Sequence, residues 1–196
     1  MGKYGAKYLK WAPFAEQTPD ALDSAYPKYG TPMSLGPLTK VTDAPTFNEA
    51  KAYGDNALAE YVVEFKECQV DVEVTDLENT VASAIYGATI NESANNDVEH
   101  GIEDNPPYGG LAFYCNRLNK EGKKFFQGIF YPKLKATMQG TEYATKGDSI
   151  TLAGGKIKFM AAAPTNGKWM VESDPMDTET EAKAWVDAKI TAAPAG

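Results

Sequence analysis

The feature that most constrains the fold is a run of alternating apolar and charged residues between positions 60 and 74. Residues 60–66 place apolar side chains at odd positions, and residues 69–74 place them at even positions. A period of two is typical of a β-strand with one buried and one exposed face. A one-residue slip turns a strand over, so the change of parity predicts a bend, bulge or tight turn near Glu67-Cys68. The opposite face is acidic and carries Glu60, Glu64, Asp71 and Glu73.

The rest of the chain contains further strand patterns separated by turn residues. Twelve prolines and 17 glycines favour many short elements, and the 11 tyrosines and 8 phenylalanines favour strands. A hairpin turn is predicted at residues 119–122. The additional predicted strands are Leu35–Val41, Ala44–Lys51, Leu111–Leu118, Lys124–Met138, Ser149–Leu152, Lys156–Ala161 and Lys168–Glu172.

Two helices are predicted, over residues 76–86 and 178–190. Each begins with a capping box, in which a threonine hydroxyl and a glutamate three residues later satisfy each other's backbone donors. The capping pairs are Thr75 with Glu78 and Thr178 with Glu181. Gly87 stands where a left-handed residue ends the first helix. The sequence therefore predicts a mainly β protein, an antiparallel β-sandwich or barrel-like fold with one flanking helix and a C-terminal helix.

The predicted organisation has three parts. Residues 1–34 form an extended N-terminal arm, residues 35–175 a β domain, and residues 176–196 a C-terminal helix and tail. Prolines interrupt the arm, and a proline-broken segment does not fold alone. Wrapping its own core and wrapping a neighbouring subunit are both open. The candidate contact residues of the arm are Tyr4, Tyr8, Trp11 and Phe14.

Charge argues against one class of function. The net charge is −8, and Arg117 is the single arginine. Proteins that bind nucleic acid specifically carry a basic face with arginine forks, and this sequence lacks one. The two cysteines form no disulfide framework or CxxC motif. The first residues do not match a signal peptide, and no apolar run approaches the length of a membrane span, so we expect a soluble protein made in the cytoplasm, with no membrane association.

The sequence offers no catalytic constellation. The one histidine, His100, lies in a polar loop over residues 91–109, away from any nucleophile motif. The acidic residues of that loop do not follow the spacing of a calcium-binding loop, so solvated carboxylates are favoured over a metal site. Phosphate-binding and dinucleotide-binding glycine motifs are missing. We therefore expect no enzyme activity, no cofactor and no metal.

Two stretches carry a family resemblance. The run Tyr143–Leu152, with the sequence YATKGDSITL, precedes the strand at Lys156–Ala161. The segment Glu64–Val72 is followed by the first predicted helix. In this order and spacing the chain resembles the major tail proteins of long-tailed, non-contractile bacteriophages over roughly residues 35–175. The first run is the more specific of the two, since a strand–turn–strand–helix pattern is generic alone.

The resemblance implies a structural virion protein of the tail. Subunits of that family form hexameric rings that stack into a tube, through which DNA is ejected into the host. The implied partners are copies of the chain, a tape-measure protein, and tail terminator and distal tail proteins. The acidic strand face (Glu60, Glu64, Asp71 and Glu73) becomes the candidate lumen lining, because a negative wall would let DNA slide. The arm residues become candidate contacts between subunits.

Three other functions are weighed against this one. A carbohydrate-binding β-sandwich would use the many aromatic side chains to stack on sugars. A small β-barrel enzyme would need an acid–base pair in a pocket, which the sequence does not supply. The tube protein of a contractile injection or type VI secretion system shares the implied architecture.

Overall fold

The computed structural model describes most of the chain, and the element boundaries below refer to that part. The described residues are 2–25, 27–54, 57–91, 93, 96–119, 121–140 and 154–191, without the side chains of 52–54 and 57–59. The predicted strand at Ser149–Leu152 and the YATKGDSITL run at Tyr143–Leu152 lie outside these residues.

The protein is mainly β, as predicted, and its strands pair antiparallel. The strands are β1 (Lys3–Pro13), β2 (Met33–Ser34), β3 (Leu38–Gly54), β4 (Ala57–Val74), β5 (Thr89–Asn91), β6 (Asp97–Glu99), β7 (Tyr108–Leu118), β8 (Lys124–Met138), β9 (Gly155–Ala161) and β10 (Val171–Glu172). The helices are α1 (Pro19–Leu22), α2 (Asn79–Tyr86) and α3 (Glu179–Ile190).

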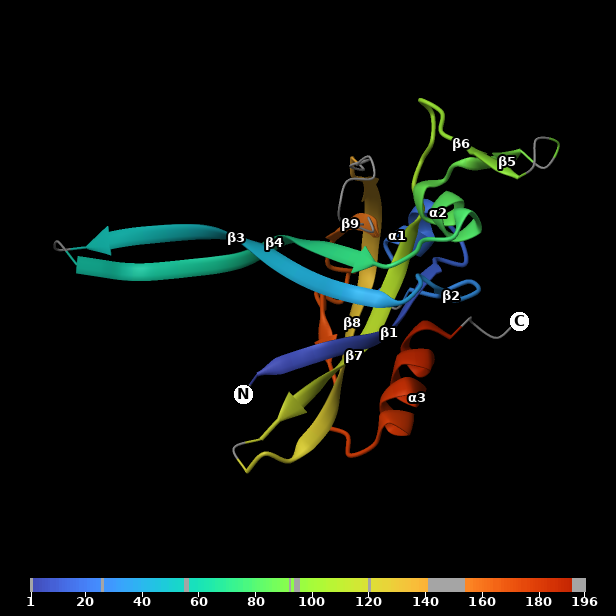
Figure 1. Ribbon diagram of the computed structural model, residues 1–196. Helices are drawn as coiled ribbons and strands as arrows, with labels where there is room; N and C mark the ends of the chain where they lie inside the picture. The colour runs from blue at the N-terminus through green and yellow to red at the C-terminus, as the bar shows by residue number, and fades with distance from the viewer. Residues whose placement is uncertain are drawn as a thin grey trace, which may run out of the picture.

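One curved sheet forms the body of the molecule (Figure 1). Its order is β2-β1-β7-β8-β9-β4-β3, with β10 pairing beside β8, and β5 and β6 form a separate small hairpin. The inner face carries the main core, where valines of β4 meet Ile157 and Phe159 of β9 and Leu111 and Phe113 of β7. This architecture confirms the predicted antiparallel, sandwich-like fold with a C-terminal helix.

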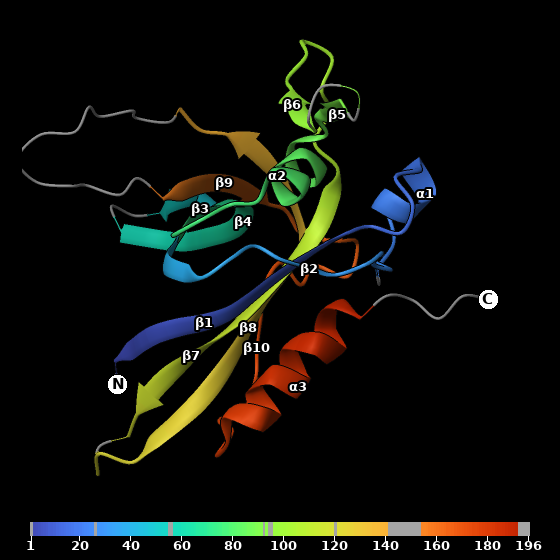
Figure 2. The same ribbon diagram turned by 45° about the vertical axis from the view of Figure 1, so that its right-hand side comes forward.

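A second core lies on the other face of β1, β7 and β8, under α3 (Figure 2). Ala182, Val186 and Ile190 of the helix are fully buried there. Trp185 packs over Gly128 of β8, where a Cβ atom would lie 2.2 Å from the indole ring. Both faces of β7 and β8 are therefore covered within the chain.

The two helices differ in how well the sequence predicted them. The capping box of α3 is confirmed, because Thr178 and Glu181 bond each other's backbone N–H groups. The prediction of a capping box at Thr75 is wrong. The N–H of Thr75 donates to the carbonyl of Pro37, which holds this residue at the end of the sheet, and α2 starts at Asn79 with no side-chain cap. Gly87 ends α2 at φ 68°, as predicted.

The change of parity in β4 is confirmed as a β-bulge. Glu67 pairs with Thr46, and Phe65 pairs with the next residue, Phe47, so Lys66 has no partner opposite it. The extra residue keeps the apolar side chains of 61–65 on the same face as the buried valines. It also brings Glu60, Glu64, Asp71 and Glu73 onto one face of one strand. The two strands predicted over residues 35–51 are one strand, β3.

The N-terminal segment corrects the expectation of a separate arm. Residues 3–13 form β1, which pairs with β7 inside the main sheet. Leu9 and Trp11 lie in the main core and Phe14 in the second core, so this segment wraps its own chain. Two shifts of register accompany positive φ angles at Gly5 (58°) and Tyr8 (57°). β1 is thus an irregular, bulged strand.

Candidate assembly surface

A long hairpin made by β3 and β4 projects from the body of the molecule (Figure 1). The two strands pair from Leu38 and Val74 out to Gly54 and Ala57. β9 pairs with β4 only from Cys68 onward, so the outer part has no third strand among the described residues. An isolated two-stranded hairpin is only marginally stable in water. The outer part of β3 and β4, residues 46–54 and 57–67, is called the projecting hairpin below.

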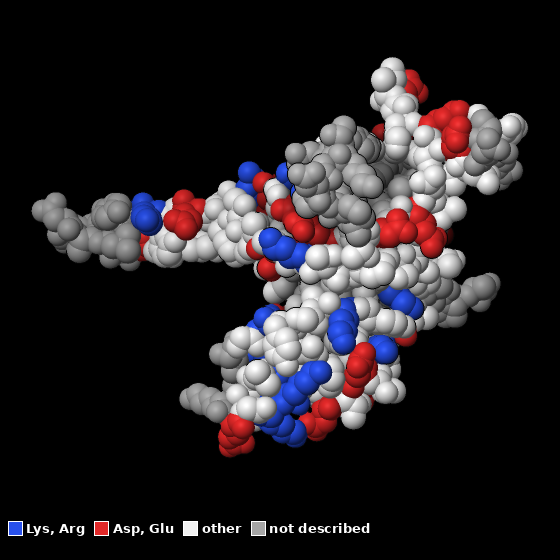
Figure 3. Space-filling view, in the orientation of Figure 1, with Lys and Arg blue, Asp and Glu red and all other residues white. Residues whose placement is uncertain are grey.

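One face of the projecting hairpin carries a row of apolar side chains that are open to solvent, with Glu49 and Lys51 paired beside them. Phe47, Tyr61 and Val63 are 43%, 47% and 46% exposed. Residues paired directly across an antiparallel ladder point to the same face, so these side chains share a face with Phe65. In Figure 3 an uncharged stretch of this hairpin lies between charged side chains further out and others where it joins the body. The sequence predicted that this row would be buried, and no part of the chain covers it among the described residues.

The root of the projecting hairpin is fixed by aromatic contacts. Phe65 stacks on Trp169 at 4.5 Å between ring centroids and 6° between planes. Phe47 meets Phe65 edge-on at 6.0 Å. Trp169 also contacts the ring of Tyr131 in β8. Stacked aromatic pairs stabilise by about 0.5–1.5 kcal/mol beyond their buried area. The direction of the hairpin is therefore set where it leaves the body.

The opposite face of the hairpin carries the predicted lumen residues, and the structure separates them into two pairs. Glu60 and Glu64 are exposed on the projecting part, and Glu64 is paired with Asn48. The other pair lies on the body, where the neighbouring strands supply lysines. Asp71 is opposite Lys158, and Glu73 lies between Lys40 and Lys156. Only the outer pair is an acidic surface without lysines directly opposite.

The predicted arm contacts have different positions in the structure. Trp11 and Phe14 are 1% and 4% exposed in cores of their own chain, so assigning them to contacts between subunits is wrong for this conformation. The reason is that β1 pairs with β7 and directs both side chains inward. The hydroxyl of Tyr8 donates to Asp187 of α3 at 3.1 Å. Tyr4, at 46% exposed, remains available.

A cleft of about 360 Å³ opens between β1 and β3. Lys3–Ala6 form one wall and Thr39–Val41 the other, both strand edges. The apolar floor is formed by Phe113, Cys115, Ile129, Tyr131 and Met170. Sequence reasoning missed this cleft, because no local pattern reports that the first and last long strands of a curved sheet approach each other.

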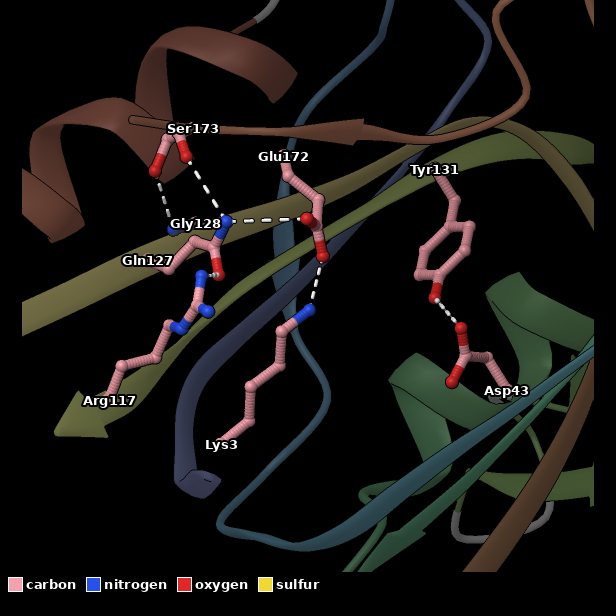
Figure 4. Close-up of polar contacts among 8 residues, drawn as sticks. All are labelled: Lys3, Asp43, Arg117, Gln127, Gly128, Tyr131, Glu172 and Ser173. Carbon is pink, nitrogen blue, oxygen red and sulfur yellow. Dashed lines mark hydrogen bonds and ion pairs between the residues drawn. The ribbon is translucent and has the colours of Figure 1, made fainter. Parts of the chain in front are cut away.

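Polar contacts border the cleft (Figure 4). The ammonium of Lys3 pairs with Glu172, and Gln127 donates to the same carboxylate at 3.3 Å. Arg117 donates to the amide oxygen of Gln127 at 2.7 Å. On the opposite side the hydroxyl of Tyr131 donates to Asp43 at 3.3 Å, and burial raises the pKa of this phenol. These contacts link β1, β7, β8 and β10 on one side and β3 with β8 on the other.

The groups that could support chemistry are dispersed or inert. Burial raises the pKa of the Cys68 thiol to about 11, and the pKa of the Cys115 thiol is raised for the same reason. Thiols in this state are poor nucleophiles at neutral pH. His100 lies beside Asp104 and the ring of Tyr86. Within the described residues no three His, Cys, Asp or Glu side chains are grouped to hold a metal.

The surface charge is unevenly distributed. No lysine or arginine occurs between Glu67 and Asn116, and Figure 3 shows acidic side chains over β5 and β6. Among the described residues, no helix is both long enough and apolar enough to span a bilayer.

Comparison with known proteins gives no family assignment. No family model matches the sequence, and no curated protein matches it.

Proposed function

We propose that this chain is a structural subunit that assembles with copies of itself into stacked rings, forming the tube of a bacteriophage tail. The observation that carries the proposal is the projecting hairpin, with an apolar face and two strand edges that the chain leaves uncovered in its described part. Exposed apolar surface of this kind marks interaction sites. The resemblance of residues 35–175 to major tail proteins supplies the identity of the assembly.

The two edges of the hairpin are complementary to each other. Within the described residues, the outer edge of β3 and the edge of β4 before Cys68 both present backbone groups without a strand partner. Pairing β3 of one copy with β4 of the next is a heterologous contact, which repeats around a ring when the rotation closes. A ring of this kind joins the hairpins into one continuous sheet.

The acidic face of that sheet lines the channel in this proposal. Glu60 and Glu64 lie on the face opposite to Tyr61 and Val63, so a sheet that buries its apolar face presents these carboxylates to the lumen. A negative wall repels the phosphates of DNA and lets the molecule pass without being held. Asp71 and Glu73 contribute less to this wall, because lysines lie opposite them.

Negative-stain microscopy and analytical ultracentrifugation of the purified chain test the proposal. We expect rings or tubes with a central hole that form as the protein concentration rises. The variant Tyr61→Asp places a charge on the apolar face and should remain monomeric. A wild-type protein that stays monomeric at every concentration and salt condition would exclude self-assembly. A monomer that binds sugars would favour the carbohydrate-binding alternative.

A further inference from the structure

The cleft between β1 and β3 lies along a strand edge that is unpaired among the described residues. Its two walls are the edges of strands that approach each other without pairing among the described residues. The β3 edge runs regularly from Lys40 to Thr46, whereas β1 carries two bulges. A regular edge accepts an added strand through backbone hydrogen bonds, and a bulged edge does not. An incoming strand therefore pairs with β3.

The floor of the cleft specifies the side chains of the incoming strand. Phe113 and Ile129 line the floor of the cleft as main-core residues that are 4% and 7% exposed, and Met170 beside them is partly buried. A strand added to β3 continues the β3–β4 layer, so its core-facing side chains point at this floor. It needs apolar side chains on one face.

The projecting hairpin has the required pattern. Because of the bulge at Lys66, Tyr61 and Val63 lie on the same side of the layer as the buried valines of β4. In a second copy joined through the edge of β4, these two side chains point into the cleft. The backbone edge of this segment is free in the described chain.

We propose that the cleft between β1 and β3 receives the projecting hairpin of a second copy of this chain. Tyr61 and Val63 close over Phe113, Ile129 and Met170, and β4 of the incoming copy extends the ladder at β3. This inference rests on the proposed self-assembly and assigns the receiving surface within it.

Site-specific photocrosslinking tests the contact. With p-benzoylphenylalanine in place of Tyr61, illumination of assembled protein should yield dimers whose crosslinked peptides contain the β3 edge or the segment around Met170. The same group in place of Ile102, which is fully exposed on the loop after β6, is the matched control. It should not reach the cleft.

A cleft-filling variant gives a second, independent measurement. Ala6→Phe narrows the cleft and should lower the association constant at least about tenfold. Ala184→Phe adds the same side chain to the exposed face of α3 and should assemble like the wild type. If the protein forms tubes but the crosslinks from position 61 map outside the cleft, the inference is overturned and the proposed function stands. Failure of the unmodified protein to form any assembly would overturn both.

Discussion

The two long hairpins of this protein are built alike and are used differently. β7 and β8 are covered on both faces, by the main core on one side and by α3 on the other. β3 and β4 are covered on one face near the body; beyond Lys66, Phe65 stacks on Trp169, and the described part of the chain leaves Phe47, Tyr61 and Val63 exposed. The first hairpin obtains its stability inside the chain. The second exposes apolar side chains that the described part of the chain does not bury.

The difference is visible in the local sequences. Residues 109–116 of β7 are buried at every position, and they are apolar except for the last, Asn116. From Glu60 to Phe65 the outer part of β4 alternates apolar and acidic residues, apart from Val62. A continuous apolar strand needs cover on both faces, whereas an alternating strand needs it on one. The alternation thus indicates one buried face without indicating which molecule buries it.

Truncation of a buried side chain in the hairpin of β7 and β8 should cause the largest loss of stability among these variants. Leu111 of β7 is fully buried, so Leu111→Ala should lower the free energy of unfolding by about 2–5 kcal/mol. Val63→Ala on the projecting hairpin should change the stability of the monomer by less than about 0.5 kcal/mol. Urea denaturation of the monomeric forms measures both. Equal losses would contradict the contrast between the hairpins.

Removing the cover supplied by α3 should have an intermediate effect. Gly128→Ala places a methyl group against the indole of Trp185 and should destabilise the protein by about 1–3 kcal/mol. Tryptophan fluorescence and limited proteolysis after α3 report whether the helix lifts off. The double variant, Gly128→Ala combined with Trp185→Ala, removes the clash between the new methyl group and the indole. If it is much less stable than Trp185→Ala alone, the clash is not the cause of the destabilisation.

Deleting Lys66 should separate folding from assembly. Loss of the bulge turns the outer part of β4 over, so Glu60 and Glu64 replace the apolar face. The monomer should lose only about 1 kcal/mol, mainly the Phe65–Trp169 stack. Assembly, measured by sedimentation, should be abolished. Lys66→Ala keeps the bulge and serves as control; normal tubes from the deletion variant would exclude the proposed use of the hairpin face.

Acidification should have the smallest effect on stability, and it should weaken the attachment of α3. The hydroxyl of Tyr114 donates to Glu179 at 2.5 Å, and this bond, with one from Lys183, lowers the pKa of the carboxyl below its usual 4.5. A lowered pKa means stabilisation that is present above pH 4.5 and lost as the pH falls through the folded-state pKa. The effect is small because solvent screens the Glu179 side chain, which is 42% exposed. Urea midpoints between pH 6 and 3 should fall more for the wild type than for Glu179→Gln.

Local sequence patterns were enough to predict much of the fold. Strict alternation and its change of parity predicted the strands and the bulge of β4, since each depends on neighbouring residues alone. The capping box at Thr178 and the left-handed Gly87 were predicted for the same reason. The capping box at Thr75 failed because Pro37, distant in the sequence, takes the backbone N–H that the box needs.

The candidate site was predicted only in part. Glu60 and Glu64 were correctly placed on one strand face, but the lysines opposite Asp71 and Glu73 come from β3 and β9, and no local pattern reports strand order. Trp11 and Phe14 share the aromatic, proline-broken character of a free arm, yet pairing with β7 buries them.

Alternation in the sequence determined by itself that residues 60–74 form a strand with one apolar and one acidic face, because a side chain's direction in a strand follows from its position. Tertiary structure alone decided that the valines of this strand are buried while Tyr61 and Val63 are left exposed. The reason is length: β4 continues beyond the point where β9 and the core can cover it. The same pattern therefore stabilises the fold in its inner half and leaves Tyr61 and Val63 exposed in its outer half.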